Sequence, residues 1–291
     1  MNGILLLDKP RGLSSNAALQ RVRHLTGADK AGHVGSLDPL ATGMLPICLG
    51  EATKVAGELT AARKRYRFAI ALGTRTATGD LEGEVVATAP VPALTASGME
   101  RVLSRFRGSQ WQVPPMYSAL KRAGQPLYRL ARAGVTVERA PRQIEITELA
   151  LLGLAGDQLE LEALCSKGTY IRVLGEDIAQ ALGTCGHVAA LRRLFVEPFD
   201  QAPMHTLVEV EAACRAGRVP ELIAADAALP GMPAVRVSAD LACRLAHGQT
   251  VMVAGGTPDG KVRLYDPQGR FMGLGEADSQ GQVRPRRMFA S

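Results

Sequence analysis

The sequence of 291 residues predicts an α+β protein with a large N-terminal domain over residues 1–233 and a small β-rich domain over residues 234–291. In the first part of the chain, segments with the apolar pattern of strands are interspersed with amphipathic helical segments. Beyond residue 233, short strand-like segments follow one another, separated by Gly-Gly and Pro-Gln-Gly. With 46% hydrophobic and 21% charged residues, the chain can bury a sizeable core.

Strands are expected where short runs are continuously apolar or alternate between apolar and polar residues. Residues 3–7 (GILLL) are a continuous run that ends in a turn cluster, and residues 65–72 (RYRFAIAL) alternate. The turn Ala155-Gly156-Asp157 joins two further strands as a pair. The expected strands of the large domain are residues 3–7, 65–72, 82–89, 146–154, 158–166 and 189–196.

Helices are expected where capping residues precede an apolar face. Ser97 and Glu100 match a capping box, and Thr169 is placed to cap a helix with Ile171 and Leu174 on its apolar face. The expected helices run from Ser14 or Ser15 to Gly27, over about 51–61, from Ser97 to about Gly108, over 126–133, and from Thr169 to Gly183. A mostly helical stretch then extends to about residue 233.

Residues 33–46, HVGSLDPLATGMLP, have neither a helical nor a strand period and are expected to form a loop. This loop contains a single carboxylate, that of Asp38, among glycines, prolines and aliphatic residues. Asp-Pro commonly begins a turn, which would explain Asp38 without any chemistry. Alternatively, the carboxylate is the reactive group and the loop is its mount.

Cysteine and histidine usage argues against a disulfide framework or a zinc site. The five cysteines are scattered, odd in number and lack a C-x-x-C pair, and the five histidines are also scattered. The first residues, MNGILLLDKP, lack the basic region and cleavage site of a signal peptide, and no apolar run has the length of a membrane helix. We therefore expect a cytoplasmic protein without a bound metal.

Basic residues are concentrated in two segments, although the net charge is only +6. Residues 1–75 hold 11 Lys and Arg against 5 Asp and Glu, and residues 105–142 hold 8 against 1. The second segment overlaps a proline-broken stretch over about 109–142 that also contains Trp111, Tyr117 and Tyr128. Such segregation is typical of proteins that bind a polyanion, although a solvated charge run would also produce it.

The sequence lacks the Walker loop, G-x-G-x-x-G, G-x-S-x-G and H-E-x-x-H motifs, so the candidate functional residues are isolated ones. From the residues alone, each candidate has an ordinary structural explanation. These explanations are a turn for Asp38, a core position for Tyr66, a loop hydrogen bond for His33, a solvated first helical turn for Arg172, and a strand end for Lys9-Pro10.

Four motifs change this assessment, because in this order and at this spacing they resemble the bacterial TruB-type tRNA pseudouridine synthases. They are GHVGSLDPLATGMLPICLGEATK, KRYR, PPMYSALK and CSKGTYIR. The opening LLLDKPRGLSS and the terminal VRPRRMF are also similar to that family, so the resemblance covers nearly the whole chain. LDPLATG and SKGTYIR are highly specific in combination. Val34 and Ser36 depart from the threonine, glycine or alanine that is more usual there.

The resemblance implies isomerisation of uridine to pseudouridine at position 55 in the T loop of tRNA. The glycosidic N1–C1′ bond breaks, the uracil turns within the site, and C5 joins C1′. The implied fold has a mixed, mostly antiparallel central sheet flanked by helices, an RNA-binding insertion over about 109–142, and a C-terminal PUA-like β domain from residue 234. The target uridine must leave its stack to react.

The resemblance also assigns roles to residues of this chain. It implies that Asp38 is the essential aspartate, Tyr66 the active-site tyrosine, and Arg172 the partner of the aspartate. His33, Tyr170 and Leu191 would surround the flipped nucleotide, and Lys9 and Pro10 would support the active-site loop. RNA contacts are expected from Arg63, Lys64, Lys121, Arg122, Arg129 and Arg132.

The chemistry of these residues agrees with such roles. An arginine beside Asp38 lowers the pKa of the carboxyl, which keeps it ionised to act as a nucleophile or base. Apolar neighbours such as Leu37 and Leu40 exclude water from a reactive sugar intermediate. The first step stays open between attack of Asp38 on C1′, attack on uracil C6, and proton abstraction at C2′.

The expected partner is tRNA, and neither a membrane nor an obligatory protein partner is expected. We expect a monomer that needs no cofactor, because isomerisation is redox-neutral and consumes no water. Three other functions are considered: a non-catalytic RNA-binding protein, a guide-RNA-dependent synthase, and a nucleoside or sugar hydrolase. The hydrolase would require a second carboxylate that the sequence does not place.

Overall fold

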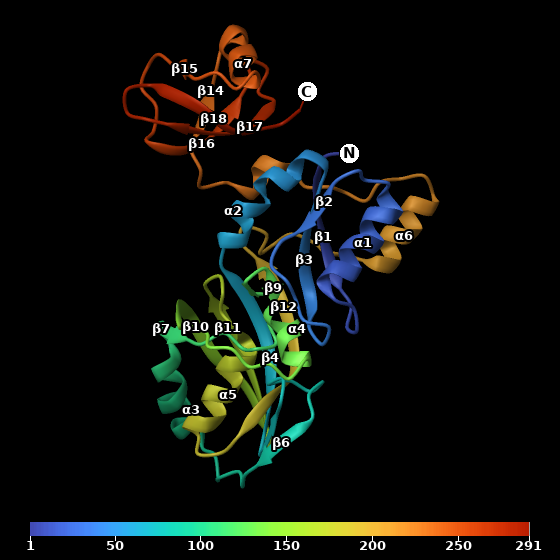
Figure 1. Ribbon diagram of the computed structural model, residues 1–291, viewed down its shortest axis with the longest axis vertical. Coiled ribbons are helices and arrows are strands. Elements are labelled where there is room, and N and C mark those ends of the chain that lie inside the picture. The colour runs from blue at the N-terminus through green and yellow to red at the C-terminus, as the bar shows by residue number, and fades with distance from the viewer. Residues whose placement is uncertain (291) are drawn as a thin grey trace.

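The protein is built around one long mixed sheet in the computed structural model, which describes the structure of residues 1–290 (Figure 1). Within these residues, nine strands form the sheet in the order β13-β1-β3-β12-β4-β11-β10-β7, with β2 paired to β3. They are β1 (Gly3–Lys9), β2 (Ala31–His33), β3 (Thr42–Leu49), β4 (Lys64–Leu72), β7 (Gly108–Gln112), β10 (Arg142–Ala155), β11 (Gln158–Cys165), β12 (Gly186–Val196) and β13 (His205–Thr206). The expected α+β fold with a mixed, mostly antiparallel sheet is confirmed.

Helices cover the sheet in two groups that correspond to its two halves. Helices α3 (Ala96–Leu103) and α5 (Ile171–Ala181) pack on β4, β10, β11 and β12 in the largest hydrophobic core. Helices α1 (Ser15–Thr26) and α6 (Leu207–Arg215) pack on β1 and β3 in a second core. A third core lies beneath the 3₁₀-helix Gly50–Val55 and α2 (Ala56–Ala61).

The two halves of the sheet meet where β3 runs parallel to β12. Two residue pairs, Arg192 with Thr42 and Arg193 with Gly43, give the register of this contact. All other pairings of the long strands in the sheet are antiparallel, and the short β13 is parallel to β1. The loop that carries Asp38 ends at Thr42, so it lies beside this junction.

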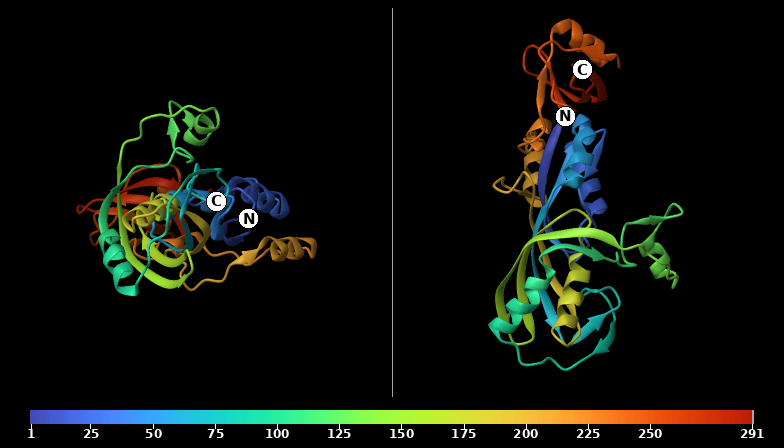
Figure 2. Two further views of the ribbon diagram at one scale, coloured as in Figure 1. Left: turned by 90° about the horizontal axis from the view of Figure 1, so that it is seen from below. Right: turned by 90° about the vertical axis from the view of Figure 1, so that its left-hand side faces the viewer.

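Two smaller parts extend from the main sheet. The segment with β8 (Lys121–Arg122), β9 (Gln125–Pro126) and α4 (Leu127–Arg132) projects from the body of the molecule (Figure 2). The C-terminal strands form a separate five-stranded sheet at one end of the elongated molecule (Figure 1). These strands are β14 (Ala234–Arg236), β15 (Val251–Met252), β16 (Gly260–Tyr265), β17 (Phe271–Ala277) and β18 (Gln282–Met288), with α7 (Ala239–Ala246) beside them. A hairpin of β5 (Thr74–Thr76) and β6 (Val85–Thr88) lies near β12.

Several element predictions were wrong in part. The expected loop over 33–46 ends at residue 41, because residues 42–46 belong to the central strand β3, which was missed because it is buried along nearly its whole length and contains Pro46. The N-cap of α3 is Thr95, not Ser97, and its hydroxyl accepts from the Gly98 N–H. Tyr170 rather than Thr169 precedes α5, and the Thr169 hydroxyl donates to the Ser166 carbonyl. In the C-terminal part, the strand-like segment over 235–242 includes only the end of β14, and α7 begins at Ala239 with Ser238 as its cap.

No helix in residues 1–290 is both long enough and apolar enough to cross a membrane.

The junction between β3 and β12 should be the position most sensitive to an added methyl group. Gly43 has φ +98°, and a Cβ there would lie 2.1 Å from the carbonyl oxygen of Arg193. We expect Gly43→Ala to lower the free energy of unfolding by at least about 3 kcal/mol, because backbone strain and a clash with main chain combine. Urea denaturation followed by circular dichroism measures this change.

Gly57→Ala is the matched control, since Gly57 lies in α2 and nothing is within 4 Å of an added Cβ. Its free energy of unfolding should stay the same or rise by up to about 1 kcal/mol. Equal unfolding midpoints for the two variants would contradict the close approach at Gly43.

Candidate active site

The loop between β2 and β3 is fixed to the rest of the protein through its main chain, which leaves the Asp38 side chain free to project. The Ser15 hydroxyl accepts from the Leu37 N–H at 2.6 Å and donates to the Leu37 carbonyl at 2.9 Å. The Gly12 N–H donates to the Pro39 carbonyl, and the Ala41 N–H closes a turn onto the Asp38 carbonyl. Asp38 therefore does begin a turn, and its carboxylate remains available for other contacts.

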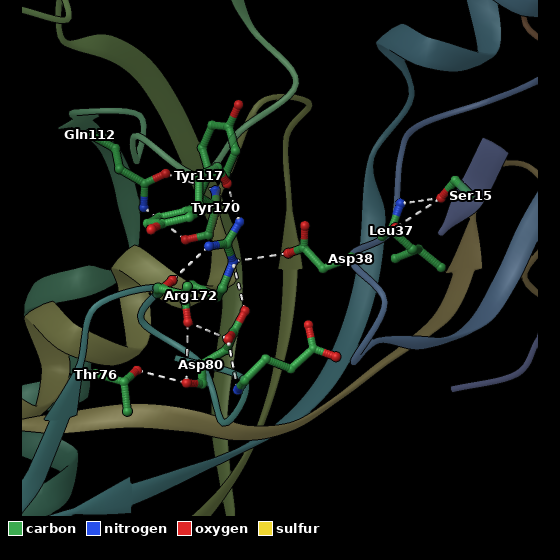
Figure 3. A network of polar contacts seen from close by, with 11 residues as sticks. Ser15, Leu37, Asp38, Thr76, Asp80, Gln112, Tyr117, Tyr170 and Arg172 are labelled. Carbon is green, nitrogen blue, oxygen red and sulfur yellow. Dashed lines mark hydrogen bonds and ion pairs between the residues drawn. The ribbon is translucent and has the colours of Figure 1, made fainter. Parts of the chain in front are cut away.

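Arg172 lies in the first turn of α5 and is only 4% exposed. Its Nε donates to Asp38 Oδ2 at 2.9 Å, as Figure 3 shows. Nη1 donates to the Thr78 carbonyl and Nη2 to the Tyr117 carbonyl, each at 2.6 Å. The guanidinium thus joins the Asp38 loop, the β5–β6 hairpin and the insertion. Because the Arg172 side chain is buried, the alternative that it is a solvated arginine of the first helical turn is excluded.

Asp80 is a second carboxylate in the site that sequence reasoning missed. It is 4% exposed, and its Oδ2 lies 3.6 Å from Arg172 Nε (Figure 3). Its Oδ1 accepts from the Thr78 hydroxyl at 2.5 Å and from the Glu82 N–H at 3.1 Å. In the sequence, Thr78-Gly79-Asp80 is an ordinary turn cluster between two strands, so no local signal distinguishes it.

Burial in the pocket raises the pKa of Asp38 above its usual value, and the Asp80 carboxylate acts in the same direction. The charge and hydrogen bond of Arg172, together with the charge of Lys9, act to lower this pKa. The arginine has the predicted effect, but desolvation is larger, so the net shift is opposite to the one expected from the sequence. Asp38 is therefore a partly desolvated carboxylate held by one strong cationic partner.

A cavity of about 850 Å³ opens in front of Asp38, within the size range of small-molecule and cofactor sites. Its walls come from the Asp38 loop, the start of α1, the β5–β6 hairpin and the insertion. The lining residues include Ser14, His33, Leu37, Asp38, Thr78, Asp80, Glu82, Tyr117, Tyr128, Arg132 and Arg172. The projecting insertion thus covers one side of the site.

The other predicted active-site residues differ in their relation to this cavity, and Tyr66 and Tyr170 are not among its lining residues. His33 lines it, and burial lowers the pKa of His33, which favours the neutral ring. Tyr66 lies on β4, is 8% exposed and packs in the main core with Leu37 and Leu191. Burial raises the pKa of Tyr66, with the Arg193 guanidinium opposing this shift. Leu191 does not line the cavity in front of Asp38 but borders a hollow with the outward-facing Arg67.

Tyr170 and Lys9, two further predicted residues, are held by hydrogen bonds between main-chain and side-chain groups. Both the N–H and the carbonyl of Tyr170 are bonded to the Gln112 side chain, as Figure 3 shows. Lys9 is fully buried and donates from Nζ to the carbonyls of Pro10 and Leu13, while Pro10 itself is exposed. Burial lowers the pKa of Lys9 to about 8.

The six residues predicted to contact RNA fall into two groups. Lys121, Arg122, Arg129 and Arg132 are exposed on the insertion, and Arg132 lies over the Tyr128 ring at 5.8 Å. Arg63 is exposed but forms a two-point ion pair with Glu197. The prediction for Lys64 disagrees with the structure, because Lys64 is 5% exposed and its Nζ donates to the carbonyls of Thr60 and Ala62.

Comparison with known proteins places these features in a family context. Residues 23–171 match the TruB family pseudouridylate synthase N-terminal domain, and residues 172–223 and 233–289 match two C-terminal domain families of tRNA pseudouridylate synthase B and pseudouridine synthase II TruB. The tRNA pseudouridine synthase B of Stutzerimonas stutzeri is 50% identical over 295 residues, covering 100% of this chain and 96% of its own. That of Ectopseudomonas mendocina is 50% identical over 293 residues, covering 99% and 95%.

Solved structures give the same fold. A chain of an H/ACA ribonucleoprotein bound to a substrate RNA containing 2′-deoxyuridine has a TM-score of 0.76 at 21% identity, covering 99% of this chain and 85% of its own. A chain of a Cbf5-Nop10-Gar1 complex has a TM-score of 0.76 at 23% identity, with the same coverage.

The opposing charges around Asp38 predict the direction in which the pKa of Asp38 changes when either charge is removed. Replacing Asp80 by Asn removes a nearby negative charge, so the pKa of Asp38 should fall. Replacing Arg172 by Gln removes the charge and hydrogen bond that stabilise the carboxylate, so this pKa should rise. Carbon-13 NMR titration of labelled aspartate carboxyls measures both changes.

Asp278→Asn, in the C-terminal sheet region, serves as the control and should leave the Asp38 titration unchanged. Shifts of the same sign in the Asp80 and Arg172 variants would show that the two groups do not oppose each other at Asp38.

Proposed function

The chain belongs to the TruB family of pseudouridylate synthases, and we propose that it converts uridine 55 in the T loop of tRNA to pseudouridine. The observation that carries this proposal is the Asp38 carboxylate, held by Arg172 at 2.9 Å and facing a cavity large enough for a nucleotide base and sugar. A binding protein without catalysis would not need a partly desolvated carboxylate with a buried cationic partner.

The reaction moves one bond and conserves all atoms. The uridine leaves its stack and enters the cavity, the N1–C1′ bond breaks, the uracil turns, and C5 bonds to C1′. The hydrogen on C5 leaves as a proton, and N1 gains one, so the product is an isomer. No oxidant, reductant or water is consumed, and accordingly the proposal includes no cofactor.

Asp38 is the group that we propose to start the reaction, as the nucleophile at C1′ or at uracil C6, or as the base at C2′. Arg172 holds its carboxylate in one orientation and favours the ionised form. The Tyr66 hydroxyl is proposed to take part in proton transfer at C5. His33, Tyr170 and Leu191 are proposed to surround the nucleotide, and Lys9 and Pro10 to support the loop.

We propose that the nine-stranded and the five-stranded sheet belong to two domains with different functions. Residues 1–233 form the catalytic domain with the insertion over about 109–142, and residues 234–291 form a PUA-like domain. The exposed basic residues of the insertion are proposed to contact the tRNA backbone beside the cavity. We further propose that the enzyme acts in the cytoplasm as a monomer without an obligatory protein partner.

Asp38→Asn tests the catalytic role directly. We expect release of tritium from [5-³H]uridine-labelled tRNA to fall to background, because an amide can neither attack carbon nor accept the proton. The dissociation constant for tRNA, measured by filter binding, should change by less than about threefold, or about 0.7 kcal/mol. Retained tritium release by this variant would disprove the role of Asp38.

The insertion should contribute affinity rather than chemistry. We expect Lys121→Gln and Arg129→Gln each to weaken tRNA binding at low salt and to reduce the slope of log affinity against log salt by about 0.7–0.9 per lost phosphate contact. The single-turnover rate at saturating enzyme should stay near that of the unaltered protein.

Arg215→Gln on α6 is the control, since Arg215 is exposed and ion-paired with Glu211 outside the insertion. If the slope of log affinity against log salt is unchanged in both insertion variants, Lys121 and Arg129 do not contact the RNA.

A further inference from the structure

Arg193, at the junction of β3 and β12, is a buried cation that the proposed mechanism does not use. We propose that Arg193 is a positioning residue that clamps both ends of the Asp38 loop, so that the carboxylate faces the cavity. This inference rests on the proposed function, because the loop position matters only if Asp38 reacts there. Arg193 itself lines neither the cavity nor the molecular surface.

The first observation is that Arg193 is fully buried without an acidic partner. Its exposure is 0%, and no carboxylate within residues 1–290 lies within ion-pair distance of it. Moving a guanidinium out of water is unfavourable unless hydrogen bonds replace the lost hydration. The contacts that provide this replacement therefore indicate where the residue acts.

Nε and Nη2 of the guanidinium donate to main-chain carbonyls that flank Asp38, whereas Nη1 has no hydrogen-bond partner in residues 1–290. Nη2 donates to Gly35 at 2.9 Å and to Val34 at 3.3 Å, just before the aspartate. Nε donates to Met44 at 2.6 Å, just after the loop has entered β3. One planar group thus holds the two ends of the segment together.

The backbone of Arg193 contributes to the same contact. It pairs with Gly43 where β3 and β12 run parallel, and there the two strands approach too closely for a side chain at residue 43. At the other end of the loop, Gly35 has φ +65°, and a Cβ there would lie 3.1 Å from Arg193 Nη1. Both glycines therefore allow the loop to close around this arginine.

A lysine could not reproduce this arrangement. The three carbonyls accept from two different nitrogens of the guanidinium, whereas an ammonium on a flexible stem is a point donor without a fixed fork. The charge would be kept, but the two ends of the loop would no longer be held by one rigid group. Misplacement of a reactive group by about 1 Å can reduce a rate by about 10²-fold.

The test compares Arg193→Lys and Arg193→Gln with Arg192→Lys. Arg192 is adjacent on β12 but points to the opposite side, where it pairs with Asp8. We expect the two Arg193 variants to lose about 10²-fold in single-turnover pseudouridine formation. Their tRNA dissociation constants should remain within about threefold of the unaltered protein. Arg192→Lys should retain the rate.

Hydrogen exchange separates loop positioning from a general loss of structure. In the Arg193 variants, amides of residues 34–44 should exchange faster, while those of β10 and β11 should exchange as in the unaltered protein. If Arg193→Gln does not fold, Arg193→Lys alone decides. If the unaltered protein forms no pseudouridine, the proposed function fails, and faster exchange confined to residues 34–44 still supports the clamp.

Three results would overturn the proposal. They are an unchanged rate in Arg193→Lys, a rate loss fully explained by weaker tRNA binding, and an exchange increase spread evenly over the domain.

Discussion

The contact between Arg172 and Asp38 is the interaction around which the site is assembled. A guanidinium withdrawn from water needs hydrogen-bond acceptors, and each nitrogen of the Arg172 guanidinium donates to a group from a different segment. The side chain at the start of α5 therefore joins the Asp38 loop, the β5–β6 hairpin and the insertion (Figure 3). The chemical result is a carboxylate with a raised pKa that is ion-paired with Arg172.

The place of this contact in the fold explains the composition of the loop. Asp38 lies beside the narrow junction where the two halves of the sheet meet, and main chain crowds main chain there. Glycine at residues 35 and 43 permits that approach, while buried leucines close the loop against the core. The turn that Asp38 begins and the chemistry proposed for it are compatible, because the turn uses its carbonyl and the reaction its side chain.

Local sequence patterns predicted the elements whose residues alternate in polarity or show a helix cap and an apolar face. The strand at 64–72 alternates, and the helix that begins after Ser14 has its cap and apolar face in the sequence. Thr42–Leu49 could not be recognised, since a strand buried along nearly its whole length shows no alternation. Asp80 and Arg193 were missed for a different reason: their partners are distant in the chain, and no spacing rule connects them. Arg172 was linked to Asp38 only through the family resemblance.

The most direct test of the central claim is to incubate the purified protein alone with an unmodified tRNA transcript and map pseudouridine by carbodiimide labelling and mass spectrometry. The account predicts one pseudouridine per tRNA, at position 55 in the T loop, formed without added cofactor or partner. Absence of pseudouridine, or its formation outside the T loop, would contradict the account.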